Sequence, residues 1–510
     1  MDRLNGNDSA LSDSGEGTKN AVTPQTSIEE ITRQLQAAAA ELNAEPPATA
    51  HAELLEQLLA QVRRVDFSAE AGKGENEPVP LPDIAVIVCH EVERLAKANN
   101  WQMCQREGFF WLYNGCYWQK VTDPEMERFL GLAAKGMSLN ELTAERFTFR
   151  EVLRKQFSAS GYLPEPPAQT DGDVKINLKN GTLAIGGGGG KISPFNPADF
   201  LRYQMPFGYD PQAKAPLWHK FLGEVLPDES LQAVLCEMLA YTFIPKSVLK
   251  LEKCLFLYGS GANGKSVVFE VISALLGREN VSNYSITSLT DRNGYYRAEL
   301  SGKLLNYASE ISGDMEAALF KQLVSGEPIE ARLPYRDPQI ISNYAKLVFN
   351  ANRLPDVPEF THAFFRRFVI IPFDVTIAEA RQDRDLPQKI ISAELPGVLN
   401  WILGGLSRLT ENRCLSASEA VSVQVANFRT ESDTVSLFIN EKIEDGELAR
   451  DIDGSVTVKW LYALFAAWSR ENGYRQMSNR SFTGRMKAIG FESERNNAER
   501  LYSGINIVKT

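Results

Sequence analysis

The spacing of hydrophobic and polar residues changes several times along the chain, and each pattern predicts a different kind of element. Over residues 49–65, leucines at positions 54, 55, 58 and 59 share one stripe with the period of an amphipathic helix. This helix would either pack on its own domain or serve as an oligomerisation element, and the pattern leaves both open. A helix is also expected over about 27–43, because Ser27 and Glu30 form a capping-box pair. Residues 1–26 are rich in Gly, Ser, Asn and Asp and are expected to be disordered.

From residue 83 to about 245 the pattern is mixed. The stretch FFWLYNGCYWQKV predicts two strands joined by an Asn114-Gly115 turn, and VKINLKNGTLAI predicts a second hairpin. Five glycines follow at Gly186–Gly190. No lysine-serine pair comes after them, so they are interpreted as a loose turn rather than a phosphate loop. Helical spacing returns over Leu217–Phe243, and a domain of mixed α+β structure is expected here.

Two further patterns complete the chain. Residues 249–416 alternate short apolar runs with helix-like stretches, as α/β folds do. Residues 434–510 combine two helical patterns with a strand-like end, as a winged helix does. The predicted fold class is α/β with four parts: an acidic, partly disordered arm with helical segments (1–82), a mixed α+β domain (83–245), an α/β domain (246–420) and a winged-helix-like module (421–510).

Composition narrows the class of protein. The 510 residues are 44% hydrophobic and 23% charged, which is ordinary for a folded protein in water. No apolar run approaches the ~18–20 residues of a membrane helix, and the N-terminus lacks the pattern of a signal peptide, so no membrane partner is expected. Six cysteines without a C-x-x-C pair and four histidines offer no metal-ligand spacing. We therefore expect reduced, buried thiols and a cytoplasmic location, in a bacterial host by preference.

The net charge of −11 is unevenly distributed. Residues 1–80 hold 14 acidic and 6 basic side chains, whereas residues 459–510 hold 4 acidic and 9 basic ones. An overall acidic protein is not coated with nucleic acid, but local positive charge leaves room for a polyanionic partner. Acidity therefore does not exclude DNA binding.

The most specific motif of the chain matches G-x-x-x-x-G-K-[ST] and consists of Gly259, Ser260, Gly261, Ala262, Asn263, Gly264, Lys265 and Ser266. The apolar stretch CLFLY precedes it and VVFEVISALL follows it, which predicts the order strand, glycine loop and helix. The glycines let backbone N–H groups face a phosphate, and the helix N-terminus adds partial positive charge. Lys265 is expected to reach the β- and γ-phosphates of ATP, and the Ser266 hydroxyl is expected to bind Mg²⁺.

Two later strands are predicted to end beside this loop. LLNYA is followed by Ser309-Glu310, and AKLVF leads into a segment that holds Asn350 and Asn352. Ligands of open parallel sheets bind at the carboxyl ends of the strands, so Glu310 is placed to polarise the attacking water or to help hold Mg²⁺. Asn352, with Asn350 as second choice, could hold that water through its amide. The competing interpretations are a surface glutamate and an Asx turn before Pro355.

The stretch FFRRFVIIPF places Arg366 and Arg367 just before a buried strand. Arginine gives permanently charged, bidentate contact with a phosphoryl group. An arginine finger that acts on a neighbouring copy requires an active site between subunits. The competing interpretation is a structural ion pair at the start of the strand.

In order, GSGANGKS, SE, KQLVSGEPIEAR, FNANRLP and FRRFVIIPF resemble the motif set of superfamily 3 helicases, most closely the helicase half of the phage, plasmid and poxvirus primase-helicase group. YDPQAKAPLWHKFL upstream and SFTGRMKAIGF downstream resemble the domain before the motor and the C-terminal winged helix of that group. The resemblance covers roughly residues 85–510. It implies an AAA+ P-loop core, ATP and Mg²⁺ as cofactors, a homo-hexameric ring, and a replicative helicase of a phage, prophage or plasmid-like element that translocates on single-stranded or forked DNA.

The resemblance also implies individual roles. Lys265 and Ser266 would bind the nucleotide and Mg²⁺, Glu310 would be the Walker B acid and Asn352 would be sensor 1. Arg367 would be the finger because it directly precedes the strand, with Arg366 as second choice. A channel-facing hairpin would lie over about 329–341 and contact DNA through Arg332, Tyr335 and Arg336.

The chain departs from the group in one respect. Many relatives carry a primase domain ahead of the motor, and the 80 residues available here are too few for one. We expect a stand-alone helicase whose partner is a separate primase or replication-initiation protein.

Two alternatives stay open. One is a P-loop enzyme with a small-molecule substrate, such as a kinase, which would need no arginine from a neighbour. The other is a nucleotide-gated DNA-binding or assembly protein at a replication origin, without processive unwinding.

Overall fold

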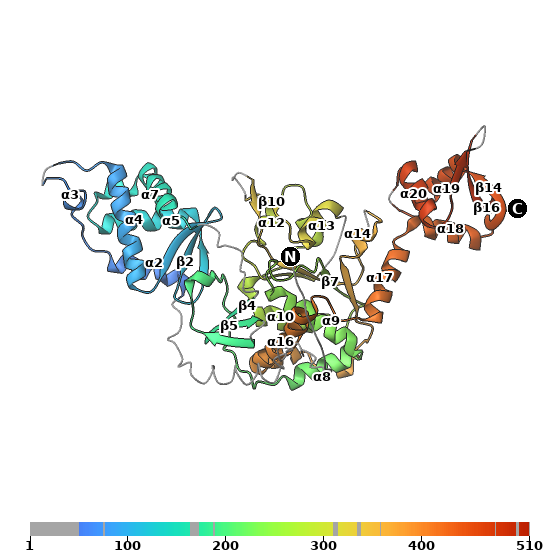
Figure 1. Ribbon diagram of the computed structural model, residues 1–510, viewed down its shortest axis with the longest axis horizontal. Coiled ribbons are helices and arrows are strands. Elements are labelled where there is room, and N and C mark those ends of the chain that lie inside the picture. The colour runs from blue at the N-terminus through green and yellow to red at the C-terminus, as the bar shows by residue number, and fades with distance from the viewer. Residues whose placement is uncertain are drawn as a thin grey trace, which may run out of the picture.

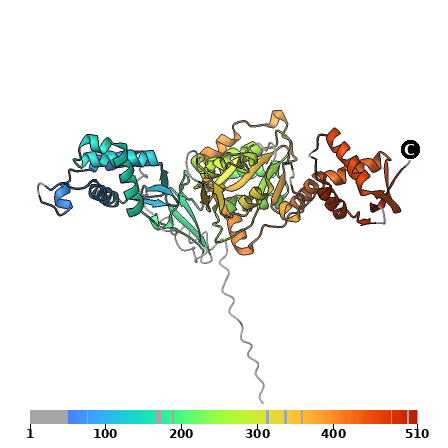
Figure 2. The same ribbon diagram turned by 90° about the horizontal axis from the view of Figure 1, so that it is seen from above.

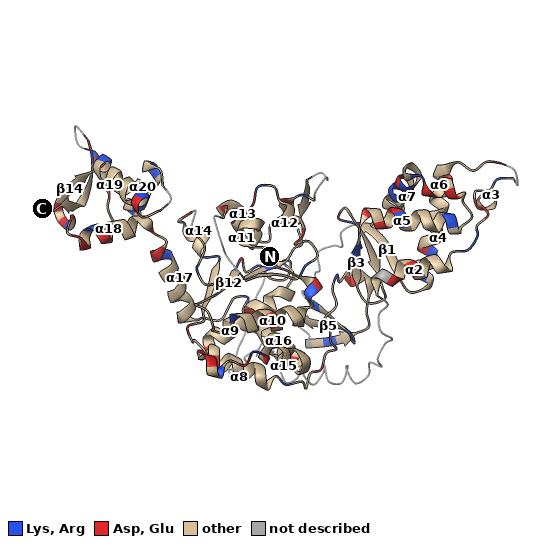
Figure 3. Cartoon of the chain, turned by 180° about the vertical axis from the view of Figure 1, so that it is seen from behind, with Lys and Arg blue, Asp and Glu red and all other residues tan. Residues whose placement is uncertain are grey.

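The computed structural model describes residues 50–74, 77–163, 173–186, 189–309, 315–333, 338–356, 359–474, 476–495 and 499–508. The predicted helix over 27–43 and the predicted site residues Glu310, Tyr335 and Arg336 lie outside them. The described residues form a helical part with a small sheet at one end, a parallel-sheet core in the centre and a small module at the other end (Figures 1 and 2). Acidic and basic residues are interspersed along the elements of all three parts (Figure 3).

Helices surround the core of the N-terminal part. They are α2 (His51–Gln61), α3 (Phe67–Glu70), α4 (Leu81–Ala98), α5 (Asp123–Gly136), α6 (Glu141–Glu145) and α7 (Phe147–Ser160). The helix expected over 49–65 is α2, and its Leu54 and Leu58 are buried in a core shared with α4, α5 and α7. Its apolar stripe therefore packs on its own domain, which is the first of the two interpretations.

Both predicted hairpins are confirmed. The first sheet consists of β1 (Gln102–Arg106), β2 (Phe109–Tyr113) and β3 (Trp118–Val121), and the second of β4 (Val174–Leu178), β5 (Gly181–Gly186) and β6 (Gly189–Ser193). All their strand pairs are antiparallel. Gly186 pairs with Gly189 across the β5–β6 connection, so the glycine run belongs to a hairpin. The second sheet shares its hydrophobic core with the central part of the molecule.

The central sheet is parallel and has the strand order β13-β7-β12-β9-β8. Its strands are β7 (Cys254–Tyr258), β8 (Val281–Ser282), β9 (Leu305–Ala308), β12 (Lys346–Ala351) and β13 (Phe368–Pro372), and a separate antiparallel pair is formed by β10 (Ile329–Ala331) and β11 (Gln339–Ile341). The mixed α/β class is thus confirmed.

Helices cover both faces of this sheet. They are α8 (Pro216–Val225), α9 (Glu229–Ala240), α10 (Lys265–Leu276), α11 (Ile286–Leu289), α12 (Tyr295–Ala298), α13 (Ala317–Val324), α14 (His362–Phe365), α15 (Leu386–Ala393), α16 (Leu395–Asn412) and α17 (Glu419–Glu431). Along β7, Leu255 and Leu257 share a core with α8, α9, α10 and α16, whereas Phe256 shares one with α13, α14 and α17. Successive side chains of a strand point to opposite faces, so this alternation shows that β7 is buried on both faces of the sheet.

The C-terminal module has a hydrophobic core of its own. Its elements are α18 (Thr434–Glu444), β14 (Leu448–Thr457), α19 (Val458–Glu471), α20 (Asn479–Ala488), β15 (Ser493–Arg495) and β16 (Arg500–Ile507). The three strands form an antiparallel sheet in the order β14-β16-β15. The two helices and the final strand predicted in this part are confirmed. Figure 1 shows α17 running from this module down beside the central sheet.

Two further findings concern the whole described chain. No single described helix combines the length and apolar character of a membrane span. Two consecutive segments, Glu379–Ala393 and Leu395–Asn412, reach them only when taken together, and they are bent by 81° relative to each other. All six cysteines are free, and four of them are buried. The expectation of buried thiols is wrong for Cys414, which is exposed, and for Cys116, which is half-buried, because each lies outside the hydrophobic cores.

Candidate functional site

The G-x-x-x-x-G-K-S motif forms the connection between β7 and α10, as predicted. Gly264 precedes α10 with φ +90°, a left-handed conformation that favours glycine. A Cβ atom at this position would lie 2.8 Å from the ring of Phe221. No side chain caps the first turn of α10, and that turn holds no acidic residue. The turn therefore presents backbone N–H groups and the positive end of a helix dipole, which suits an anion such as a phosphate.

The ammonium group of Lys265 lies over the loop. It donates hydrogen bonds to the carbonyl oxygens of Gly259 at 2.7 Å and Ser260 at 2.9 Å, and to Oδ1 of Asn263 at 2.9 Å. These three acceptors match the three donors of an ammonium group. Burial lowers the pKa of Lys265. A phosphate group that binds this lysine would take over acceptor positions now filled by the loop itself.

Asn263 attaches the loop to the neighbouring strand. Its amide donates to the carbonyl oxygen of Ser260 at 2.5 Å and to that of Phe373, just after β13, at 2.9 Å. The backbone N–H of Ile377 donates to the carbonyl oxygen of Ala262 at 2.9 Å, which adds a second link to the same segment. The motif allows any residue at position 263, so this role could not be predicted from the motif.

The neighbouring strand ends lie beside the loop. In the parallel register Ala351 is paired with Tyr258 and Phe349 with Ala308, so Asn352 and Ser309 leave the sheet at the same edge as Gly259. Asn352 is exposed. The structure thus brings the predicted sensor position and the residue before Glu310 to the edge that carries the motif loop.

Asn350, the second choice for the water-holding amide, is buried and already bonded. Its Oδ1 accepts from the Tyr307 hydroxyl at 3.0 Å, and its Nδ2 donates to the carbonyl oxygen of Lys265 at 3.4 Å. The side chain therefore ties β9 and β12 to the first residue of α10. This position suits a structural role, whereas Asn352 lies two residues further, where the alternation of a strand would keep it on the α10 side.

Arg366 and Arg367 lie at the opposite edge of the sheet. Phe368 is paired with Cys254 at the start of β7, and the N–H of Cys254 donates to the carbonyl oxygen of Arg367 at 2.8 Å. The five residues of β7 separate this edge from the loop, about 15 Å at the ordinary rise of a strand. Neither guanidinium group is placed to act at the Gly259–Ser266 loop of its own chain.

The two arginines differ in their surroundings. The side chain of Arg366 is 49% exposed and pairs with Glu252 at 2.6 Å, whereas that of Arg367 is 10% exposed. Arg367 donates to the Ser325 hydroxyl at 2.9 Å and to the carbonyl oxygen of Ala363. Burial lowers the pKa of Arg367, and the charge of Glu252 opposes that shift. Glu252 could not be predicted as a partner, because it lies more than one hundred residues upstream.

A cavity of about 400 Å³ opens beside this pair. Its lining combines α13 with the arginine turn and includes Lys321, Glu327, Arg366 and Arg367. Lys321 is paired with Glu359 at 2.6 Å. Three of its seven lining residues are cationic, and the cavity lies at the edge of the sheet that is far from the loop.

The hairpin predicted over 329–341 is present as the antiparallel pair of β10 and β11, with Ile329 opposite Ile341. Arg332 lies just beyond β10 and is exposed. Leu333 next to it packs against the aromatic residues of the first sheet. The structure thus confirms the hairpin and gives the place of one of its three predicted DNA contacts.

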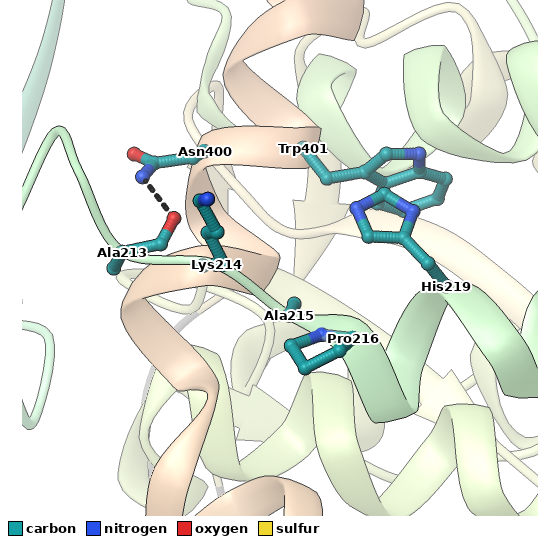
Figure 4. Close-up of a pocket in the computed structure, with 8 residues that line it drawn as sticks. Ala213, Lys214, Ala215, Pro216, His219, Asn400 and Trp401 are labelled. Atoms are coloured by element: carbon teal, nitrogen blue, oxygen red, sulfur yellow. Dashed lines mark hydrogen bonds between the residues drawn. The ribbon is translucent and has the colours of Figure 1, made fainter.

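A second cavity, of about 390 Å³, lies on the α8–α16 side and was not predicted. Lys214, His219 and Trp401 line it, and the Asn400 amide closes one side by donating to the carbonyl oxygen of Ala213 at 3.0 Å (Figure 4). No residue of the predicted site reaches it. Among the described residues there is no cluster of three or more His, Cys, Asp or Glu side chains that could hold a metal ion.

Three segments match known protein families. Residues 92–227 match the family described as D5 N terminal like, and residues 430–505 match that described as poxvirus D5 protein-like. Between them, residues 257–367 match a family of unknown function, DUF5906. The segment 257–367 contains the motif loop, the ends of β9 and β12, and the arginine pair.

Individual proteins are also similar. A helicase-named protein of Acanthamoeba polyphaga mimivirus is 24% identical over 166 residues, which is 30% of this chain and 16% of that protein. The chain thus covers less than a fifth of that relative. The apo structure of the NrS-1 C-terminal region has a TM-score of 0.45 and 12% identity over 82% of this chain and 98% of that one.

The described chain is a mixed α/β protein whose parallel sheet holds a glycine-rich motif loop at the carboxyl edge of its strands. The D5-type matches on both sides of this sheet and the helicase-named relative confirm the resemblance seen in the motifs. These matches support a protein of the phage and poxvirus primase-helicase type.

Proposed function

We propose that this chain is an ATP-dependent, ring-forming replicative DNA helicase of a phage, prophage or plasmid-like element. Its central part would be an AAA+ P-loop core that hydrolyses ATP with Mg²⁺ at the contact between two copies. One observation carries this proposal: the motif loop and the arginine pair lie at opposite edges of the same sheet, too far apart to serve one site within a chain.

In the proposed site, one subunit holds the nucleotide. The N–H groups of the loop and the first turn of α10 would bind the phosphates, and the Lys265 ammonium would exchange its loop acceptors for phosphate oxygens. Ser266 and Glu310 would hold Mg²⁺, which neutralises phosphate charge when bound. Glu310 would also polarise the attacking water, and Asn352 would orient it by hydrogen bonds.

The neighbouring subunit would supply a cation from Arg366 or Arg367. Arg366 is the better placed of the two in this structure, because its exposed guanidinium group can leave Glu252 without unfolding a buried contact. Arg367 would first have to give up Ser325 and Ala363. A surface that binds a different surface of the next copy closes into a ring, which fits a homo-hexamer.

DNA would pass through the middle of the ring. The β10–β11 hairpin would face the strand with Arg332, Tyr335 and Arg336, and its arginines would contact phosphates. A winged-helix-like C-terminal module would add a contact to duplex DNA or to a partner such as a separate primase or replication-initiation protein. A narrow basic channel satisfies DNA binding even though the whole chain is acidic.

The test is strand displacement on forked DNA, with ATP turnover measured in the same samples. The wild-type protein should separate the strands and the Lys265→Ala variant should not, and the native mass should rise to a six-fold assembly with nucleotide. A wild type that hydrolyses ATP yet separates no strands would support the nucleotide-gated assembly protein instead. A protein that stays a single copy with full ATPase activity would overturn the shared site.

A further inference from the structure

One arginine of the C-terminal module points back toward the central part of the chain. Arg485 lies in the last turn of α20, and only 17% of its side chain is exposed. Its Nη1 donates to Oδ1 of Asp433 at 3.2 Å, and its guanidinium carbon lies 3.8 Å from the ring centroid of Phe360. A guanidinium group at this distance from an aromatic face makes a cation–π contact. Arg485 is therefore held between its own module and a residue of the core.

Phe360 belongs to the segment that leads into the arginine turn. Its ring lies 5.0 Å from that of Phe365, the last residue of α14, and Thr361 caps α14 by accepting from the N–H of Phe364. Arg366 and Arg367 follow immediately. Only the single turn of α14 separates Phe360 from the arginines, and Arg366 is six positions after Phe360. A displacement of Phe360 would therefore displace the arginines as well. The segment under Arg485 thus leads directly into both arginines.

The other side of this contact is fixed within the C-terminal module. The Asp433 carboxylate is buried and also accepts from the N–H groups of Val435 and Ser436, so it caps α18. α17 completes the junction: its Phe428 ring packs 5.6 Å from Phe365. Burial lowers the pKa of Arg485 and the charge of Asp433 opposes that shift. The guanidinium group is therefore oriented by the start of α18 and moves with the module.

We propose that Arg485 is a positioning residue that couples the C-terminal module to the arginine turn, so that the placement of the module sets the placement of Arg366 and Arg367. This inference rests on the proposed function, in which that turn acts on the ATP of a neighbouring copy. A ligand that moves the C-terminal module would then change the rate of hydrolysis at the next subunit, rather than ATP binding in its own.

The experiment is a complementation assay with the full chain, measuring ATP turnover without DNA. Arg485→Gln alone should lower kcat about 10-fold and leave the KM for ATP within about twofold, because it displaces a cation needed in the transition state. Lys265→Ala alone should be inactive but still present an intact arginine turn. When Arg485→Gln and Lys265→Ala are mixed at equal amounts, about a quarter of the contacts between subunits pair an intact loop with an intact turn. Turnover should therefore recover to about a quarter of the wild-type value.

One reference mixture separates this inference from the proposed function. The doubly substituted Arg366→Ala, Arg367→Ala chain mixed with Lys265→Ala should show the same recovery. If that reference fails to recover, the shared site itself is wrong. If the reference recovers and the Arg485→Gln mixture stays at the value expected from dilution, about half of the activity of Arg485→Gln alone, the coupling role is wrong.

Matched variants exclude a simple folding defect. Arg450→Gln removes an arginine that lies 5.5 Å from the Phe491 ring within the module, and it should leave kcat unchanged. Phe360→Leu removes the same contact from the core side, together with a longer one to Arg429 at 5.5 Å, and should complement Lys265→Ala as Arg485→Gln does. Loss of activity in Arg450→Gln equal to that in Arg485→Gln would overturn the proposal, because any loosening of the module would then suffice.

Discussion

The two edges of the central sheet handle their positive charge in opposite ways. At the carboxyl edge a single ammonium group, that of Lys265, has all three donors satisfied by its own loop. At the amino edge Arg366, Arg367 and Lys250 gather around one carboxylate, Glu252. One edge is thus a preformed anion site with a helix N-terminus behind it, whereas the other offers cations in excess of their partners.

This difference indicates what kind of assembly suits the chain. An anion bound at the carboxyl edge would attract the cationic side chains of the amino edge. The length of β7 keeps the two edges of one copy apart. Complementary surfaces that cannot meet within a molecule can meet between molecules, and repeated head-to-tail contact closes into a ring. The proposed function depends on this complementarity, and the following changes test each edge separately.

The largest effect is expected at the carboxyl edge. Lys265→Ala removes the ammonium group that would hold the β- and γ-phosphates, and kcat for ATP should fall on the order of 1,000-fold. Steady-state phosphate release measures it, with Lys220→Ala, an exposed lysine on α8, as the matched control. Turnover within threefold of wild type would remove the loop from the active site.

The amino edge should respond differently to its two arginines. Arg366→Ala should lower kcat by about 100-fold or more without changing the melting temperature, because the exposed pair with Glu252 contributes little stability. Arg367→Ala should lower the melting temperature as well, since it leaves Ser325 without its buried partner. If only Arg367→Ala loses turnover while both variants melt as the wild type does, the finger is Arg367 and its burial must be relieved in the assembly.

The sequence was sufficient for one edge and not for the other. The strand, loop and helix around Gly259–Ser266 follow from local rules, because apolar runs set the strands and glycine permits the turn. The unequal burial of Arg366 and Arg367 depends on Glu252 and Ser325, which lie far from them in sequence and meet them only in the folded chain. The aromatic junction under Arg485 likewise joins residues more than one hundred positions apart.

A stability change should reveal the excess of cations at the amino edge. Burial and the nearby charge of Lys246 lower the pKa of Lys346, at the start of β12, to about 8, and its ammonium lies 4.1 Å from the Tyr241 ring centroid. Lys346→Met should raise the free energy of unfolding at pH 7 by about 2 kcal/mol, because the folded chain no longer holds a desolvated charge.

The pH dependence gives the control for this change. Between about pH 8 and 10 the unfolded wild-type chain binds the Lys346 proton more strongly than the folded chain does, so wild-type stability from this group should rise with pH. The advantage of Lys346→Met should therefore shrink over that range in urea unfolding measurements, whereas Lys220→Met should show no such trend. An advantage that is the same at pH 7 and pH 10 would contradict a charge-based cause.

The smallest effect is expected from the hydrogen bond that supports the carboxyl edge from within. Tyr307→Phe removes the hydroxyl that donates to Asn350 and leaves a buried amide oxygen without its partner, so the free energy of unfolding should fall by about 1–2 kcal/mol. Asn350 keeps its other hydrogen bond, to the first residue of α10, so turnover should change by no more than about threefold. Tyr295→Phe, which changes an exposed tyrosine on α12, is the matched control. A loss of turnover above 10-fold with unchanged stability would mean that this bond sets the position of Lys265 during hydrolysis. The carboxyl edge would then depend on the β9–β12 pairing as strongly as the amino edge depends on Glu252.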